Sequence, residues 1–107
     1  MKIVLKGIGA SGGIAEGVVR VATDEKNISD FKEGEILVAK FTEPSMVLMM
    51  NKAGAFITDI GGLTSHAAII AREIGVPCVA NTKNATATLT DGMRVRVDGT
   101  KGEVYAI

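Results

Sequence analysis

The chain has a single histidine, His66, and the residues around it are the most chemically informative part of the sequence. His66 follows two consecutive glycines, Gly61 and Gly62, and two hydroxyl residues, Thr64 and Ser65. Either hydroxyl residue can cap a helix, which places His66 in the first turn of that helix. Free N–H groups and the helix dipole at such an N-terminus favour a bound anion, above all a phosphate, and disfavour a protonated imidazole. A neutral imidazole has a lone pair on one ring nitrogen, so His66 is a candidate nucleophile for a phosphoryl group.

The other ring nitrogen carries the proton, and a hydroxyl or carbonyl group must hold it to select the tautomer. Thr64 and Ser65 are the candidates for this role. Gly61 and Gly62 allow the backbone to turn tightly or to approach a ligand closely. The same residues also permit a purely structural interpretation, in which His66 caps or packs the helix start and the two glycines form an ordinary turn.

Short strands and two helices are predicted to position these residues, because apolar runs alternate with glycine-rich turns along the chain. Strands are predicted over 2–5, 14–22, 35–41, 55–59 and 76–80, and a C-terminal hairpin over 93–98 and 103–107. The glycines of 7–13 predict a loop, and 24–32 has room for one helical turn. A helix is predicted over 42–52, with Thr42 as its cap and Gly54 as its stop.

The second predicted helix carries the histidine. It begins at Thr64 or Ser65, runs to about Ile74, and ends at Gly75. Its apolar stripe, which we expect to pack on the sheet, is Ala67, Ile70, Ala71 and Ile74. Arg72 lies about 240° around the helix from His66, so the two do not share a face. Strands that alternate with helices, followed by antiparallel strands, predict the α/β fold class.

Composition limits the classes of protein to which the chain can belong. Its 107 residues, of which 47% are hydrophobic, predict one folded domain over 1–107. Twelve Lys and Arg balance twelve Asp and Glu, and aromatics make up 4%, which argues against a nucleic-acid partner. A single cysteine excludes a multi-cysteine metal site. No apolar run is long enough to span a membrane, and we expect a cytoplasmic protein.

The segment 61–72 reads Gly-Gly-Leu-Thr-Ser-His-Ala-Ala-Ile-Ile-Ala-Arg. It closely resembles the phosphohistidine signature of phosphoenolpyruvate-utilising enzymes, a family that includes pyruvate phosphate dikinase, phosphoenolpyruvate synthase and enzyme I of the sugar phosphotransferase system. The resemblance continues through 9–17, 75–79 and the turns at 91–92 and 98–102. Gly12 is a departure, since family members often have proline there. The resemblance covers nearly the whole chain.

The resemblance implies a mobile, swivelling β/β/α domain that works as a phosphoryl carrier. His66 would be phosphorylated at Nε2, with Thr64 and Ser65 as further catalytic residues and Gly61, Gly62 and Arg72 as phosphate-binding residues. The implied partners are an ATP-grasp nucleotide-binding domain and a phosphoenolpyruvate/pyruvate barrel, in trans or in a longer parent chain. Mg²⁺ is expected at those partner sites, and this chain is expected to bind no metal or cofactor itself. In some plant members the residue aligned with Thr64 is a regulatory phosphorylation site.

Other interpretations remain open at this level. The initiating methionine favours a free-standing carrier over an excised domain. A non-catalytic interaction or regulatory module could retain the same fold. A swivelling domain that closes over a dehydratase site, as in aconitase-like proteins, would use Ser11 for substrate binding. Arg72 could equally make a structural ion pair or a contact at a helix end.

Three further features of the sequence are expected to be structural or are left without a role. Cys78 is expected to be a buried small hydrophobe. The methionines of 42–52 are expected in the core. Asp59 has no assigned role, because a carboxylate that orients the imidazole would also repel the incoming phosphate.

Overall fold

The computed structural model describes residues 1–22 and 30–107. The strands are β1 (Lys2–Lys6), β2 (Ile8–Ser11), β3 (Ile14–Val21), β4 (Ile36–Ala39), β5 (Ala55–Thr58), β6 (Cys78–Ala80), β7 (Arg94–Asp98) and β8 (Glu103–Ala106). The helices are the 3₁₀ helix η2 (Pro44–Met46) and the α-helices α1 (Val47–Met50), α2 (His66–Ile74) and α3 (Ala85–Thr88). The helical turn expected within 24–32 falls mostly outside the described residues.

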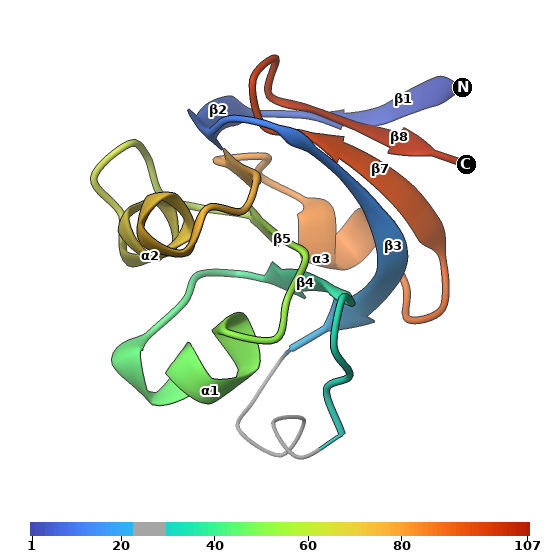
Figure 1. The fold of residues 1–107 in the computed structure, drawn as a ribbon. Helices are drawn as coiled ribbons and strands as arrows, with labels where there is room; N and C mark the ends of the chain where they lie inside the picture. Colours follow the sequence, from blue (N-terminus) through green and yellow to red (C-terminus); the bar gives the residue numbers. More distant parts are fainter. Residues whose placement is uncertain (23–29) are drawn as a thin grey trace.

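The described strands join in one sheet of order β1-β8-β7-β3-β4-β5-β6-β2. Strand β3 divides this sheet, because Ile14–Val18 pairs antiparallel with β7 and Val19–Val21 pairs parallel with β4. Strands β4, β5 and β6 are parallel, and β2 closes that half as an antiparallel edge. The sheet therefore has an antiparallel half and a mainly parallel half, which the long curved β3 connects (Figure 1).

The prediction of a loop over 7–13 was wrong, because Ile8–Ser11 forms β2. Strands β1 and β2 are consecutive in the chain but lie at opposite ends of the strand order, so the sheet curls back on itself. The Gly7 N–H donates to the Gly102 carbonyl at 2.8 Å across this closure. A Cβ at Gly9 would lie 2.4 Å from the Gly99 carbonyl oxygen. Glycine is required at Gly7 and Gly9 because two backbone segments lie close together there. The sequence alone does not distinguish this requirement from the conformational freedom of a loop.

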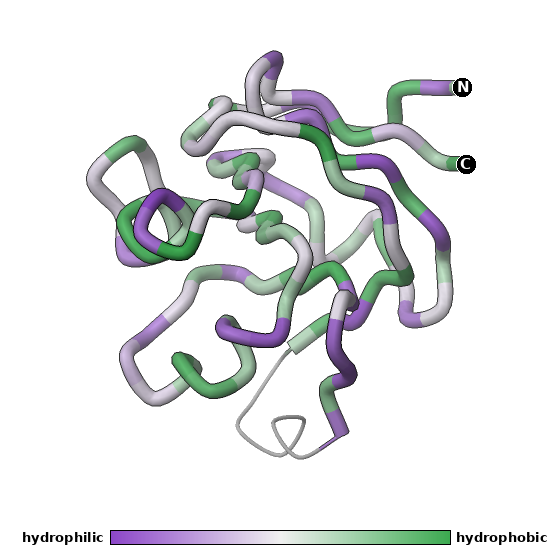
Figure 2. Tube along the Cα trace, in the orientation of Figure 1, coloured by the Kyte–Doolittle hydropathy of each residue, from purple (hydrophilic) through white to green (hydrophobic). Residues whose placement is uncertain are grey.

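Two apolar layers separate the sheet halves and the helices. Between the parallel half and α1 and α2 lie Leu37, Met49, Met50, Phe56, Ala67, Ala68, Ala71 and Cys78, among others. Between the two halves lie Val19, Ile36, Val38, Ile57, Val79, Val95, Val97 and Val104, among others. Strands β4, β5 and β6 supply alternate residues to each layer and are buried on both faces, as parallel strands usually are. Hydrophilic and hydrophobic residues alternate along β7, which has one solvated face (Figure 2).

The resulting architecture has two β layers and one helical layer, with α1 and α2 on one side of the parallel half (Figure 1). This is the α/β fold class that the sequence pattern predicted, and its β/β/α layering is the one that the family resemblance implied. Among the described residues, no helix has the length and apolar character needed to cross a membrane.

Helix α2 forms as predicted. Ser65 is its N-cap, and Gly75 ends it in the left-handed conformation, with φ of +80°. Its buried residues are Ala67, Ala68 and Ala71, whose small side chains allow the helix to lie close to the sheet. The predicted stripe was partly wrong, because Ile74 is exposed and Ala68 is buried.

The predicted helix over 42–52 is shorter and differently capped. It consists of η2 followed by α1, and the N-cap position is Glu43, with no side-chain capping bond. Thr42 is therefore not a cap. The helical segment ends at Asn51, so Gly54 is not its stop. Met49 and Met50 are buried, as expected for core residues. Helix α3 was not predicted.

Candidate functional site

The candidate site lies where the parallel strands β4 and β5 end. The segment after β4 supplies Thr42, and the segment after β5 leads through Gly61 and Gly62 into α2, which begins at His66. In parallel sheets, loops at the carboxyl ends of strands meet at one edge, which is where such folds place their functional groups. Figure 1 shows the connection into α2 as a projecting loop, away from both termini.

His66 is half-buried, and its ring is held through Nδ1. The Thr42 Oγ1 lies 2.9 Å from this nitrogen. When Nδ1 carries the ring proton, it donates to Oγ1, and Nε2 then has its lone pair available for attack. The sequence predicts Thr64 or Ser65 in this role, and the structure places Thr42 there instead. One sequence feature could have identified Thr42. It lies just after a buried strand, and the ends of parallel strands meet at the edge of the sheet where α2 begins.

The hydrogen bonds of the Ser65 hydroxyl stabilise the turn that leads into α2. They do not hold the imidazole. Its hydroxyl donates to the Gly62 carbonyl at 2.8 Å and accepts from the Ala68 N–H at 3.4 Å. Gly61 has φ of +117°, and a Cβ there would lie 3.0 Å from Cβ of Ser65. Glycine is therefore needed at Gly61 for both conformation and space. A Cβ on Gly62 would meet nothing within 4 Å. Thr64 is exposed.

Arg72 connects α2 to two other segments. One guanidinium nitrogen donates to the Ala10 carbonyl at 2.8 Å, and the other donates to the Leu63 carbonyl at 2.7 Å. These bonds join the helix to β2 and to the loop that precedes His66. In the structure Arg72 therefore holds two backbone segments in place. Phosphate binding by Arg72 stays a prediction.

Asp59, which had no assigned role, anchors the start of the loop after β5. Its buried carboxylate accepts from the Thr86 N–H at 2.9 Å and from the Thr86 hydroxyl at 2.5 Å. Lys83 N–H donates to the Asp59 carbonyl at 2.8 Å. Asp59 thus holds the loop from the side of α3, an element that the sequence did not predict. The preceding Thr58 is buried too, and its hydroxyl has no hydrogen-bond partner among the described residues.

Cys78 lies in β6 and is fully buried beneath α2. Burial raises the pKa of its thiol to about 12, against the opposing effect of Arg72. A thiol with so high a pKa is a poor nucleophile at neutral pH, in agreement with the expected packing role. Among residues 1–22 and 30–107, no group of three His, Cys, Asp or Glu side chains is arranged to hold a metal ion.

The β/β/α layers, with a histidine at the start of a helix beside the sheet edge, are the arrangement expected of a mobile domain of phosphoenolpyruvate-utilising enzymes. The family model described as "PEP-utilising enzyme, mobile domain" matches residues 31–102, which is most of the chain. The chain belongs to this family.

Two similar proteins agree with this assignment, and a third shares only the fold. The chain is 59% identical over 104 residues to "Probable phosphoenolpyruvate synthase" of Archaeoglobus fulgidus, which covers 97% of this chain and 14% of that protein. A solution structure of an Enzyme I protein matches 75% of this chain and 33% of its own, at 38% identity and a TM-score of 0.66. Aconitase X of Thermococcus kodakaraensis, at 24% identity and a TM-score of 0.72, covers 96% of this chain and 97% of its own and shares the fold alone.

Proposed function

We propose that this chain is a phosphoryl carrier in which His66 accepts a phosphoryl group at Nε2 and transfers it to a second substrate. The observation that carries this proposal is the hydrogen bond between Nδ1 of His66 and Thr42. It engages one ring nitrogen and leaves the other for attack. The family supports the proposal, because its model and the Archaeoglobus relative are both named for phosphoenolpyruvate.

The chemical step is a displacement at phosphorus. The lone pair of Nε2 attacks, a P–N bond forms, and the P–O bond to the leaving group breaks with its electron pair on that oxygen. The ring gains positive charge, which the Thr42 oxygen stabilises through the proton on Nδ1. N–H groups at the start of α2 favour the negative oxygens of the transferred group. Transfer to an acceptor is the reverse step, in which the P–N bond breaks and a P–O bond to the acceptor forms.

The donor and acceptor would be bound by other domains. The chain spans 14% of the length of the Archaeoglobus relative, which leaves most of that protein for further domains. We propose that these are an ATP-grasp nucleotide-binding domain and a phosphoenolpyruvate/pyruvate barrel, in trans or in a longer parent chain. Mg²⁺ would accompany the phosphates there, because phosphoryl transfer depends on cations around the transferring oxygens.

The aconitase-like alternative has less support from the site. Ser11, the residue it would use for substrate binding, is buried in β2. A hydroxyl in that position is poorly placed to meet a substrate. The labelling experiment below distinguishes a phosphoryl carrier from a non-catalytic module with the same fold.

The test uses the Archaeoglobus relative from which the segment matching this chain has been deleted. This chain is added in trans with Mg²⁺ and either ATP or phosphoenolpyruvate, and intact-mass and phosphorus NMR measurements follow the product. We expect one phosphoryl group on His66, labile to acid and stable to alkali, and none on His66→Ala. An acid-stable phosphate on Thr64 or Ser65 instead would contradict the proposal.

A further inference from the structure

Arg72 is an exposed residue, yet both terminal nitrogens of its side chain donate to backbone carbonyls. Nη1 donates to the Ala10 carbonyl at 2.8 Å, and Nη2 donates to the Leu63 carbonyl at 2.7 Å. Hydrogen bonds from a charged donor are about twice as strong as those between neutral groups. The two ends of the guanidinium are therefore held by carbonyl groups of this chain.

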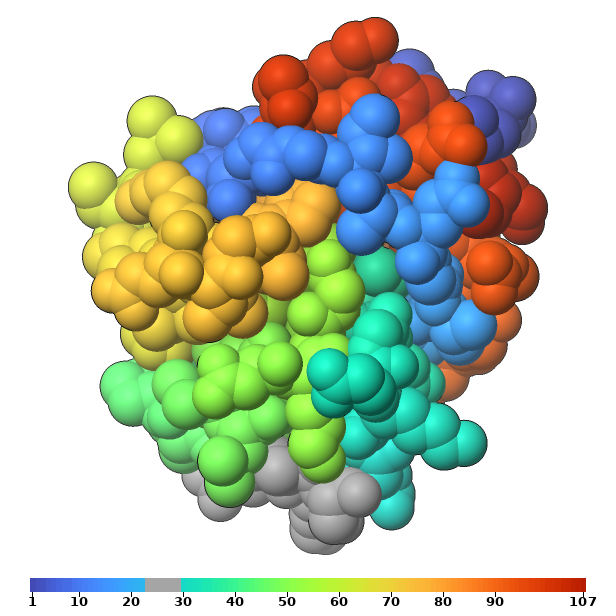
Figure 3. Space-filling model, in the orientation of Figure 1, coloured from blue at the N-terminus to red at the C-terminus, as the bar shows by residue number. Residues whose placement is uncertain are grey.

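The contacts of Arg72 and the Thr42–His66 pair lie on opposite sides of α2. Ala10 belongs to β2, at the end of the strand order, whereas Thr42 follows β4, beyond β5 and β6. In Figure 3 the yellow surface of α2 lies directly against the blue surface of β2. To reach a phosphoryl group on His66, the guanidinium would have to leave at least one of its two carbonyls.

The Leu63 carbonyl shares a peptide unit with the Thr64 N–H. This unit is planar and trans, so its C=O and its N–H point in opposite directions. Arg72 holds the Leu63 oxygen toward the β2 side of α2. The Thr64 N–H is therefore turned toward the other side, where His66 meets Thr42.

The Thr64 N–H has no acceptor among residues 1–22 and 30–107. Within the same ranges the N–H groups of His66 and Ala67 are also without an acceptor, as the first N–H groups of a helix usually are. Unpaired donors thus flank the histidine on both sides in the chain. The negative oxygens of a phosphoryl group are acceptors that suit such donors.

Resting on the proposed function, we propose that Arg72 is a positioning residue, which holds the Leu63 carbonyl so that the Thr64 N–H faces the phosphoryl oxygens on His66. A donor that is already oriented stabilises the transferring group, because it needs no reorganisation when the charge arrives. Leu63 and Thr64 are exposed, so without Arg72 their peptide unit is free to turn and its carbonyl bonds to water. The planar guanidinium reaches two carbonyls at once, whereas the ammonium of a lysine is a single point charge.

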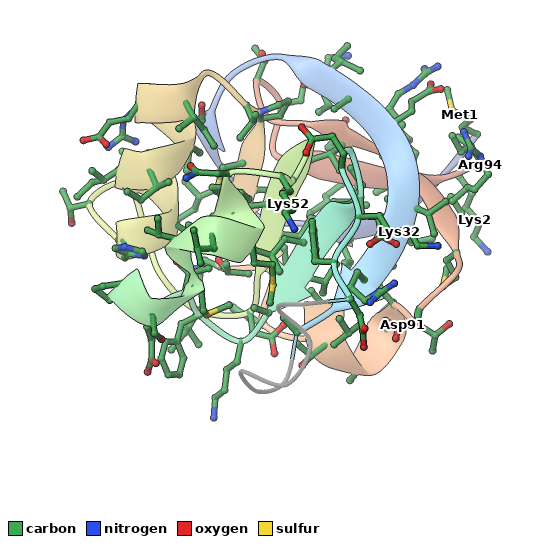
Figure 4. The ribbon with its side chains drawn as sticks, turned by 60° about the horizontal axis from the view of Figure 1, so that its bottom comes forward. Met1, Lys2, Lys32, Lys52, Asp91 and Arg94 are labelled. Carbon is green, nitrogen blue, oxygen red and sulfur yellow. The ribbon has the colours of Figure 1, made fainter. Side chains whose placement is uncertain are left out.

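The test compares Arg72→Lys with the matched control Arg94→Lys. Both substitutions keep the positive charge, and Arg94 is an exposed residue of β7. Figure 4 shows Arg94 on the side of Met1 and Lys2, away from α2. The assay is labelling of His66 by the deleted Archaeoglobus relative with Mg²⁺ and ATP or phosphoenolpyruvate, measured against the concentration of this chain.

We expect Arg72→Lys to lower the maximal rate about tenfold and to leave the half-saturating concentration little changed, because a misdirected donor is a partial form of a lost one. Arg94→Lys should stay within about twofold of the unchanged chain. An unchanged maximal rate in Arg72→Lys would overturn the positioning role and leave the carrier in place. Failure to label the unchanged chain would overturn the proposed function and the positioning role with it.

Amide NMR of the unchanged chain tests the positioning without any variant, so the proposal can be tested even if thermal melts show that Arg72→Lys does not fold. When His66 is phosphorylated, we expect the Thr64 amide proton to move downfield, because it gains an anionic acceptor. The shift should be smaller in Arg72→Lys. A Thr64 amide that does not respond in the unchanged chain would overturn the proposal. A scalar coupling between phosphorus and Nη of Arg72 would also overturn it, because Arg72 would then be a phosphate ligand.

Discussion

Thr42 and His66 are 24 positions apart in the sequence, yet Oγ1 of Thr42 lies 2.9 Å from Nδ1 of His66. Thr42 is buried and His66 is half-buried, so the hydroxyl is fixed and the ring turns its other nitrogen away from it. The pair arises because the segment after β4 and the start of α2 meet at one edge of the parallel strands.

Removing the Thr42 hydroxyl should affect the tautomer of His66. In Thr42→Val we expect phosphorylation to slow about tenfold, because less of the imidazole carries its proton on Nδ1. Thr42→Ser should restore most of the rate, since it keeps the hydroxyl. Nitrogen-15 NMR of the ring checks the mechanism. An unchanged tautomer population in Thr42→Val would assign the hydroxyl a packing role only.

His66→Ala should abolish phosphoryl acceptance and lower the free energy of unfolding by only about 1 kcal/mol. The cost comes from the lost hydrogen bond to Thr42, whose buried hydroxyl is left without this partner. Chemical denaturation measures the change. A loss of several kcal/mol would mean that the histidine is a core residue, which favours the structural interpretation.

Ser65 and Thr64 should differ although they are neighbours. Ser65→Ala loses the cap of α2 and the bond to Gly62, so we expect about 1 kcal/mol of destabilisation and slower phosphorylation. Thr64→Ala, at an exposed position, should stay within about 0.5 kcal/mol and serves as the matched control. Equal melting temperatures for the two variants would contradict the capping role.

Cys78 should make stability depend on alkaline pH. Burial raises the pKa of the thiol from 9.0 to about 12, so the folded state keeps the proton that the unfolded state releases. The stabilisation is complete below pH 9 and is lost as the pH rises from about 9 to 12. Denaturation at several pH values should show a shallower decline for Cys78→Ala. The native thiol should also resist labelling at neutral pH, and rapid labelling would show that β6 opens.

Local residue patterns alone sufficed to predict helix α2 and to place His66 at its start. Ser65 caps its own helix, Gly75 ends it, and Gly61 supplies the turn, because capping and backbone conformation depend on neighbours within a few positions. The family signature around His66 is likewise one contiguous segment.

Tertiary structure decided which groups meet the histidine and what the glycines do. The sequence predicts Thr42 to be a helix cap, whereas the fold places the end of β4 beside α2 and brings Thr42 to His66. Asp59 gains a role only in the fold, where α3 brings Thr86 to its carboxylate. The sequence predicts Gly9 to be a loop residue, whereas in the fold it lies in β2, close to the Gly99 backbone across the closed sheet. Each of these contacts joins segments distant in sequence, so its energy depends on how the strands pair and not on local preference.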